Sequence, residues 1–145
     1  MKRAKRIELL VVEDNPLDII MSREALSQAK MGNHVNIVTD GVQAMQFLHR
    51  EEPYTDAPHP DLVILDLNLP RKHGKEVLQE MKNNPELTRI PVVVLSTSGS
   101  VEDVGDSYDL HANCFITKPL EPDQFSRVIE CIQGFWLSVV NLPEE

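Results

Sequence analysis

The sequence predicts an α/β domain built on a parallel β-sheet, and two observations support this prediction. Short apolar runs of strand length alternate five times with segments whose apolar residues recur at helical spacing. The clearest runs, Leu9–Val12 and Leu62–Leu65, are continuously apolar, as expected for strands that are covered on both faces. A chain of 145 residues can bury a substantial core, so we expect a single domain, residues 1–145, with its core at about 6–137, a short apolar tail and no output domain.

Turn-forming residues bound each predicted strand. The strands are predicted at residues 7–12, 35–38, 62–65, 91–95 and 114–117. Before the third strand, residues 50–60 are polar and contain three prolines. Proline is excluded from a helix interior, so this segment is predicted to be a surface loop.

Helices are predicted between the strands and after the last one. They lie at residues 17–30, around 42–48, around 77–81, after Ser100, and from Pro122 to about Trp136. Asn15-Pro16 indicates the start of the first helix, because proline suits a first helical turn. Gly32 is well placed to end this helix. Asp40-Gly41 is predicted to turn the chain before the second helix.

The composition excludes several classes of function. A formal net charge of −9 argues against a nucleic-acid-binding module, although it is compatible with protein partners. No apolar stretch is long enough for a membrane span or a signal peptide, so we expect a cytoplasmic protein. Cys114 and Cys131 lie in apolar runs without CxxC spacing, which favours buried thiols over a disulfide or a reactive thiol.

Charged residues follow three of the predicted strands at the point where each strand ends. Glu13-Asp14 follow the first strand, Asp66 the third and Lys118 the fifth. Ligands of parallel α/β sheets bind beyond the carboxyl ends of the strands, so we expect these side chains in one pocket. Two unit charges about 4 Å apart interact by roughly 4 kcal/mol at an effective dielectric constant of about 20. Three carboxylates therefore need a compensating cation, and Mg²⁺ is the natural candidate because it takes oxygen ligands and shares its sites with phosphate.

Asp66 is then predicted to have two roles. Beside Glu13 and Asp14 it would bind the metal, and it would also attack a phosphoryl group to form an aspartyl phosphate. Lys118 and the hydroxyl of Ser96 would donate hydrogen bonds to the phosphoryl oxygens. Each residue alone has a simpler explanation, as a cap, a turn or a solvated charge. Their occurrence at successive strand ends favours a common pocket.

The combined motifs resemble those of the CheY-like response-regulator receiver domain over nearly the whole chain. The matching motifs are Glu13-Asp14-Asn15, Asp66-Leu67-Asn68-Leu69-Pro70 followed by Gly74, the 91–97 segment, and Lys118-Pro119. The resemblance implies a doubly wound, flavodoxin-like (βα)5 fold with strand order 2-1-3-4-5. It also implies phosphotransfer from a histidine kinase to Asp66, by a phosphoacceptor domain rather than an enzyme.

The resemblance also implies further site residues. Asn68 would give its backbone carbonyl to Mg²⁺, for which Mn²⁺ could substitute. Ser96, with Thr97 beside it, would be the switch hydroxyl, and Phe115 the switch aromatic residue. The peptide bond between Lys118 and Pro119 would be cis, which few X–Pro bonds are.

Three further features are similar to the small receivers that accompany bacterial and cyanobacterial phytochromes. They are the long 50–60 loop, the 107–119 segment and the Phe135-Trp136-Leu137 ending. Two residues depart from the common receiver pattern: His73 replaces the aspartate that often precedes the glycine, and Phe115 replaces a tyrosine. The resemblance implies a phytochrome as a candidate kinase.

The tail that contains Phe135, Trp136 and Leu137 is more apolar than a free terminus should be. Exposed apolar surface usually marks an interface, and a symmetric dimer is the commonest closed assembly. We therefore predict a homodimer through the last helix and tail, with Tyr108 and Phe115 as further candidates for the interface. The alternative is that the tail folds back on its own domain.

Three rival functions remain for this type of sequence. A haloacid-dehalogenase-like phosphatase needs a second carboxylate two residues after its nucleophile, where this chain has Asn68. A flavodoxin-like FMN carrier needs a phosphate-binding turn after the first strand, where Glu13-Asp14 would repel an anion. A receiver fold that acts only as an unphosphorylated scaffold is the third, and the complete acidic pocket argues against it.

Overall fold

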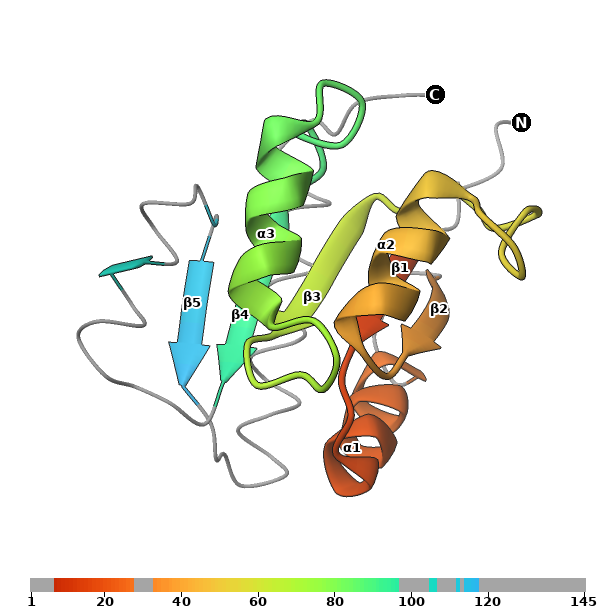
Figure 1. Cartoon of the computed structure of the whole chain (residues 1–145). Helices are drawn as coiled ribbons and strands as arrows, with labels where there is room; N and C mark the ends of the chain where they lie inside the picture. Colours follow the sequence, from red (N-terminus) through yellow and green to blue (C-terminus); the bar gives the residue numbers. More distant parts are fainter. Residues whose placement is uncertain (1–6, 28–32, 97–104, 107–111, 113, 118–145) are drawn as a thin grey trace, which may run out of the picture.

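A computed structural model describes residues 7–27, 33–96, 105–106, 112 and 114–117 of the chain. Five parallel strands form one sheet in the order β2-β1-β3-β4-β5 (Figure 1). The strands are β1 (Ile7–Val12), β2 (Asn33–Val38), β3 (Leu62–Asp66), β4 (Val92–Ser96) and β5 (Cys114–Thr117). This order confirms the expected CheY-like α/β fold. The predicted strand bounds were close, except that β2 begins two residues earlier and β4 extends to Ser96.

Three helices are described: α1 (Pro16–Ser27), α2 (Gly41–His49) and α3 (Gly74–Asn83). The first was expected at 17–30, and residues 28–32 lie outside the described part of the chain. The expected helix at 122–136 also lies outside it, and only Gly105–Asp106 of the segment after Ser100 is described, as helical. None of the helices described here is long and apolar enough to cross a membrane.

The sheet divides the core into two apolar clusters, because successive side chains of a strand point to opposite faces. On β1, Leu10 and Val12 pack with the buried residues of α2 and α3. Leu9 and Val11 pack instead with Leu26 of α1. Helices therefore cover both faces, which explains why the strand sequences are apolar without alternation.

The loop that links α2 to β3 was predicted to be a surface loop, and this prediction was only partly right. Residues 51–60 contain no helix or strand. However, Tyr54 and Ala57 pack against the larger core cluster, and the ring of Tyr54 lies 5.5 Å from that of Phe47, tilted by 57°. An aromatic ring buries a large apolar area, so the contact of Tyr54 helps to hold this polar loop against the core.

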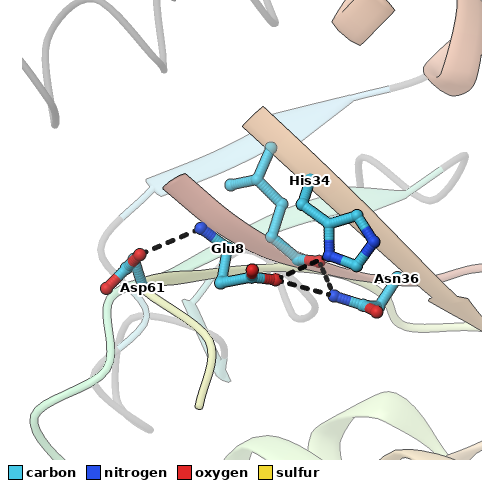
Figure 2. A network of polar contacts seen from close by, with 5 residues as sticks. Glu8, His34, Asn36 and Asp61 are labelled. Atoms are coloured by element: carbon cyan, nitrogen blue, oxygen red, sulfur yellow. Dashed lines mark hydrogen bonds and ion pairs between the residues drawn. The ribbon is translucent and has the colours of Figure 1, made fainter. Parts of the chain in front are cut away.

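The edge strand β2 is fastened to β1 by polar side chains at the end of the sheet opposite to the predicted site. Figure 2 shows that Glu8 is at the centre of this network. Its Oε2 lies 2.9 Å from Nδ1 of His34 and accepts a hydrogen bond from Nδ2 of Asn36 at 3.2 Å. Its backbone N–H donates to Asp61 Oδ2 at 2.9 Å, which ties the residue before β3 to the same strand. Glu8, a charged residue within β1, thus has a structural role.

Candidate phosphoacceptor site

The carboxyl end of β1 presents two acidic residues in different environments. Glu13 continues the sheet, since its N–H donates to the carbonyl of Val38 at 3.0 Å, and only 4% of its surface is exposed. Asp14, the next residue, is exposed. Asn15 then caps α1 by accepting hydrogen bonds from the N–H groups of Leu17 and Asp18 at 3.0 and 3.2 Å. The short turn between β1 and α1 therefore holds both carboxylates at the edge of the sheet.

Asp66 is the last residue of β3, in the centre of the sheet, and 7% of its surface is exposed. Its Oδ1 accepts a hydrogen bond from the N–H of Asn68 at 3.0 Å. Behind it, α3 starts very close to the strand: a Cβ on Gly74 would lie 2.6 Å from the Cα of Leu67 and would also collide with the carbonyl oxygen of Asp66. Glycine is required here by this close approach of two backbones.

Together, Glu13, Asp14 and Asp66 form an acidic pocket, in which one oxygen of each carboxylate lies within 4.8 Å of the others. This is the arrangement that the sequence predicted for these three residues. At 4.8 Å and an effective dielectric constant of about 20, each pair of charges repels by about 3 kcal/mol. Two of the three carboxylates are buried, so water screens this repulsion poorly and a positive partner is strongly favoured.

The donor set of the acidic pocket fits a hard divalent cation. Mg²⁺ binds oxygen ligands at about 2.0–2.1 Å, so in an octahedral site two neighbouring oxygens are about 3 Å apart and two opposite oxygens about 4 Å apart. Carboxylate oxygens within 4.8 Å of one another therefore need to approach by up to about 2 Å, or to bind through a water molecule. Among the described residues, the pocket contains no histidine or thiol that would favour a softer metal.

The other predicted site residues are described only in part. The backbone of Ser96 ends β4 and pairs with Thr117, the last residue of β5, so both strands end at the same edge of the sheet as Asp66. Phe115 is half-buried and packs against the larger core cluster. The remaining predicted residues, for which nothing further is described, are Thr97, Tyr108, Lys118, Pro119, Phe135, Trp136 and Leu137.

Two helix caps, which are formed by the side chains of Asp40 and His73, were not predicted from the sequence. Asp40 was predicted only to turn the chain, but its buried carboxylate caps α2, accepting from the N–H of Gln43 at 2.7 Å, and pairs with Arg71 at 3.2 Å. The pattern of Asp followed three residues later by Gln was the available signal. His73, noted only as a departure, caps α3 through Nδ1, which accepts from the N–H of Lys75 at 3.1 Å. An imidazole nitrogen thus replaces the carboxylate that is common in this position.

The model of the response regulator receiver domain family matches residues 9–130, and the chain belongs to this family. A receiver is a phosphoacceptor signalling domain of two-component systems, which agrees with the acidic pocket at the carboxyl edge of the sheet. Among curated proteins, the chain is 44% identical over 135 residues to the response regulator Rcp1 of Synechocystis sp. (strain ATCC 27184 / PCC 6803 / Kazusa), covering 93% of this chain and 92% of Rcp1.

Solved structures give the same assignment. The structure of the phosphorylated cyanobacterial phytochrome response regulator RcpA superposes with a TM-score of 0.92 at 47% identity, covering 97% of this chain and 100% of RcpA. The Mn²⁺-bound form of Rcp1 superposes with a TM-score of 0.89 at 43% identity, covering 95% of this chain and 99% of Rcp1. The chain is therefore similar over nearly its full length to phytochrome response regulators.

Proposed function

We propose that this chain is the receiver of a two-component phosphorelay and accepts a phosphoryl group on Asp66 from a histidine kinase of the phytochrome type. The observation that carries the proposal is the acidic pocket, in which the buried Asp66 lies beside Glu13 and Asp14 at the carboxyl edge of the sheet. The likeness to RcpA and Rcp1 supports the choice of a phytochrome as the partner.

The proposed reaction is the transfer of a phosphoryl group to the Asp66 carboxylate. A carboxylate oxygen forms a bond to phosphorus while the bond between phosphorus and the donor imidazole nitrogen breaks, and the electron pair stays on that nitrogen. The N–H of Asn68 holds Oδ1 of Asp66 at 3.0 Å and so fixes the plane of the nucleophile. Mg²⁺ or Mn²⁺, held by Glu13, Asp14, Asp66 and the carbonyl of Asn68, would neutralise the charge of the transferring oxygens.

The product needs further donors, and these define the proposed switch. Lys118 and the hydroxyls of Ser96 and Thr97 would contact the phosphoryl oxygens, with the peptide bond before Pro119 in the cis form. Movement of Ser96 toward the phosphoryl group would draw Phe115 after it, because packed side chains have few intermediate arrangements. The half-buried position of Phe115 against the core is compatible with such a movement.

The proposed output is a change in the surface of a cytoplasmic receiver domain. A homodimer through Tyr108, Phe135, Trp136 and Leu137 is the form that we propose for it. Sedimentation at micromolar concentration, with and without a phosphoryl mimic, tests this part separately. A monomer under both conditions would remove the dimer while leaving the phosphoacceptor role intact.

The decisive experiment is incubation with acetyl phosphate or a phosphorylated kinase, with and without Mg²⁺, followed by mass spectrometry of the intact protein. The wild type should gain one phosphoryl group only when the metal is present, and Asp66→Asn should gain none. Asp61→Asn is the matched control, since this carboxylate lies at the other end of β3, bonded to the N–H of Glu8. Labelling of Asp66→Asn, or no labelling of the wild type, would favour a different acceptor or the scaffold function.

A further inference from the structure

We propose that Arg71, through its ion pair with Asp40, is a positioning residue for the divalent-ion site. The pair would hold the loop of residues 67–73, and with it the carbonyl of Asn68, in the arrangement that binds the ion. This inference rests on the proposed function, because it concerns the metal that serves phosphorylation of Asp66.

The 67–73 loop joins the phosphoacceptor strand β3 to α3 and is closed on itself. The N–H of Gly74 donates to the carbonyl of Leu67 at 2.9 Å, and that of Lys72 donates to the carbonyl of Pro70 at 2.7 Å. At its start, the N–H of Asn68 is bonded to the carboxylate of Asp66. A displacement of the loop would therefore move both the Asn68 carbonyl and the orientation of the nucleophile.

The start of α2 supports the outer side of this loop (Figure 1). A Cβ added to Gly41 would lie 2.6 Å from Cβ of Lys72 and would also collide with the carbonyl of that residue. Asp40, directly before Gly41, uses both oxygens: Oδ1 accepts from the N–H of Gln43 and Oδ2 from Nη1 of Arg71. The support is thus built from one close backbone contact and one ion pair.

The ion pair joins Asp40, which is fixed in a helix cap, to Arg71, which belongs to the 67–73 loop. We call this pair the clasp. The Asp40 side chain is 8% exposed and belongs to a helix cap, whereas the Arg71 side chain is 58% exposed and belongs to the loop. Removing the guanidinium would leave a buried carboxylate without its counter-charge, so the loop position that brings Arg71 to Asp40 is specifically stabilised. The pair joins residues 31 positions apart and does not involve any of the three carboxylates of the acidic pocket.

The backbone of Arg71 supports the same conclusion. Its φ of 67° lies in the left-handed region, where residues with a Cβ are strained. Glycine would be the ordinary choice for such a loop position, but glycine could not reach Asp40. The contact made by the Arg71 side chain gives this position a physical reason to carry an arginine.

The chain offers a matched control for Arg71. Among the described residues, Arg50 is the other non-glycine residue with a positive φ, at 55°, and it lies at the opposite end of α2. Arg50 is also exposed, and the described part of the chain shows no ion pair to its side chain. Arg71→Ala and Arg50→Ala therefore remove the same charge from the same backbone conformation, and only the first breaks the clasp.

The test is Mg²⁺ binding to the unphosphorylated protein by isothermal titration calorimetry, with phosphorylation by acetyl phosphate as a second measurement. We expect Arg71→Ala to weaken Mg²⁺ binding about three- to five-fold, Arg71→Lys to restore most of it, and Arg50→Ala to leave it unchanged. Asp40→Asn should weaken binding similarly, and combining it with Arg71→Ala should add little, because both changes break the same pair.

Three outcomes overturn the inference and one overturns the proposed function. Wild-type Mg²⁺ affinity in Arg71→Ala, or equal losses in Arg71→Ala and Arg50→Ala, would show that the pair does not position the loop. Additive losses in the double variant would show that Arg71 acts by some route other than Asp40. If the wild type neither bound Mg²⁺ nor became phosphorylated, the proposed function itself would fail, whatever the variants did.

Discussion

Replacement of Gly74 by alanine is the most direct test of how tightly the phosphoacceptor is packed. The added Cβ would lie 2.6 Å from the Cα of Leu67, whereas ordinary contacts begin at 3.4 Å, so α3 and the strand must separate by about 0.8 Å or more. Neither neighbour is the flexible end of a side chain, since both colliding groups belong to the backbone of Asp66 and Leu67. Relief of the clash must therefore displace the nucleophile or the helix.

The size of the effect follows from overpacking. Insertion of one extra methyl group into a packed site typically costs about 1–3 kcal/mol, and we expect about 2 kcal/mol for Gly74→Ala. Alanine restricts the unfolded chain more than glycine and recovers about 0.4–1 kcal/mol where the backbone is compatible. The net loss of about 1–2 kcal/mol corresponds to a fall in melting temperature on the order of 5 °C. Since the clash lies at Asp66, affinity for Mg²⁺ should fall as well.

Gly105→Ala is the matched control for this prediction. A Cβ at Gly105 would meet no atom of the described residues within 4 Å, and Gly105 is in a helical segment. The same substitution should therefore be neutral or slightly stabilising there, with unchanged Mg²⁺ affinity. The two variants are compared by thermal unfolding and by Mg²⁺ calorimetry. If Gly74→Ala behaved like Gly105→Ala in both measurements, the close approach of α3 to Asp66 would be refuted.

Two further predictions concern polar groups away from the pocket, one buried and one partly buried. Ser22 of α1 is 3% exposed, and no hydrogen bond of its hydroxyl is found in the described part of the structure. Replacement of this hydroxyl by a methyl group in Ser22→Ala should therefore raise the free energy of unfolding by about 1 kcal/mol. Urea titration measures this change, and a loss of stability would contradict the prediction. Burial lowers the pKa of Lys82 below its ordinary value of 10.5. Just below pH 10.5, Lys82 is therefore protonated more fully in the unfolded chain than in the folded one. The free energy of unfolding should rise with pH in this range, and Lys82→Met should remove the rise.

The fold was predictable because its determinants are local. Runs such as Leu62–Leu65 are apolar at every position. This pattern is typical of a strand covered on both faces, whereas a strand with one solvent-exposed face alternates apolar and polar residues. Helix starts were also predictable where a cap is visible: Asn15 before Pro16 predicted the start of α1, and its side chain does accept hydrogen bonds from the first turn. The errors of one or two residues at the strand ends are those expected when pairing with a neighbouring strand extends a strand beyond its apolar run.

The grouping of the three carboxylates was predictable for a different reason. A parallel sheet brings the carboxyl ends of its strands to one edge whatever the sequence of the helices between them. Glu13, Asp14 and Asp66 could therefore be placed together from their positions in the chain, and the structure does bring them within 4.8 Å. Strand-end positions also predicted that Lys118 and Ser96 contact the phosphoryl group, whereas the switch roles of Ser96, Thr97 and Phe115 were inferred only by resemblance. These roles all stay predictions.

The contacts that support the pocket could not be predicted, because they depend on which loops meet. Arg71 is one of several basic residues near Asp66, and no local pattern says that its partner is Asp40, 31 positions earlier. The same holds for Tyr54, whose contact with Phe47 is decided by the path of a loop and not by any periodicity. In this domain, strand ends determine where the carboxylates lie, whereas by our proposal loop contacts such as the Arg71–Asp40 pair determine how firmly they are held. Variation of affinity among receivers with identical carboxylates is therefore expected to arise in residues like Arg71, which a motif search does not detect.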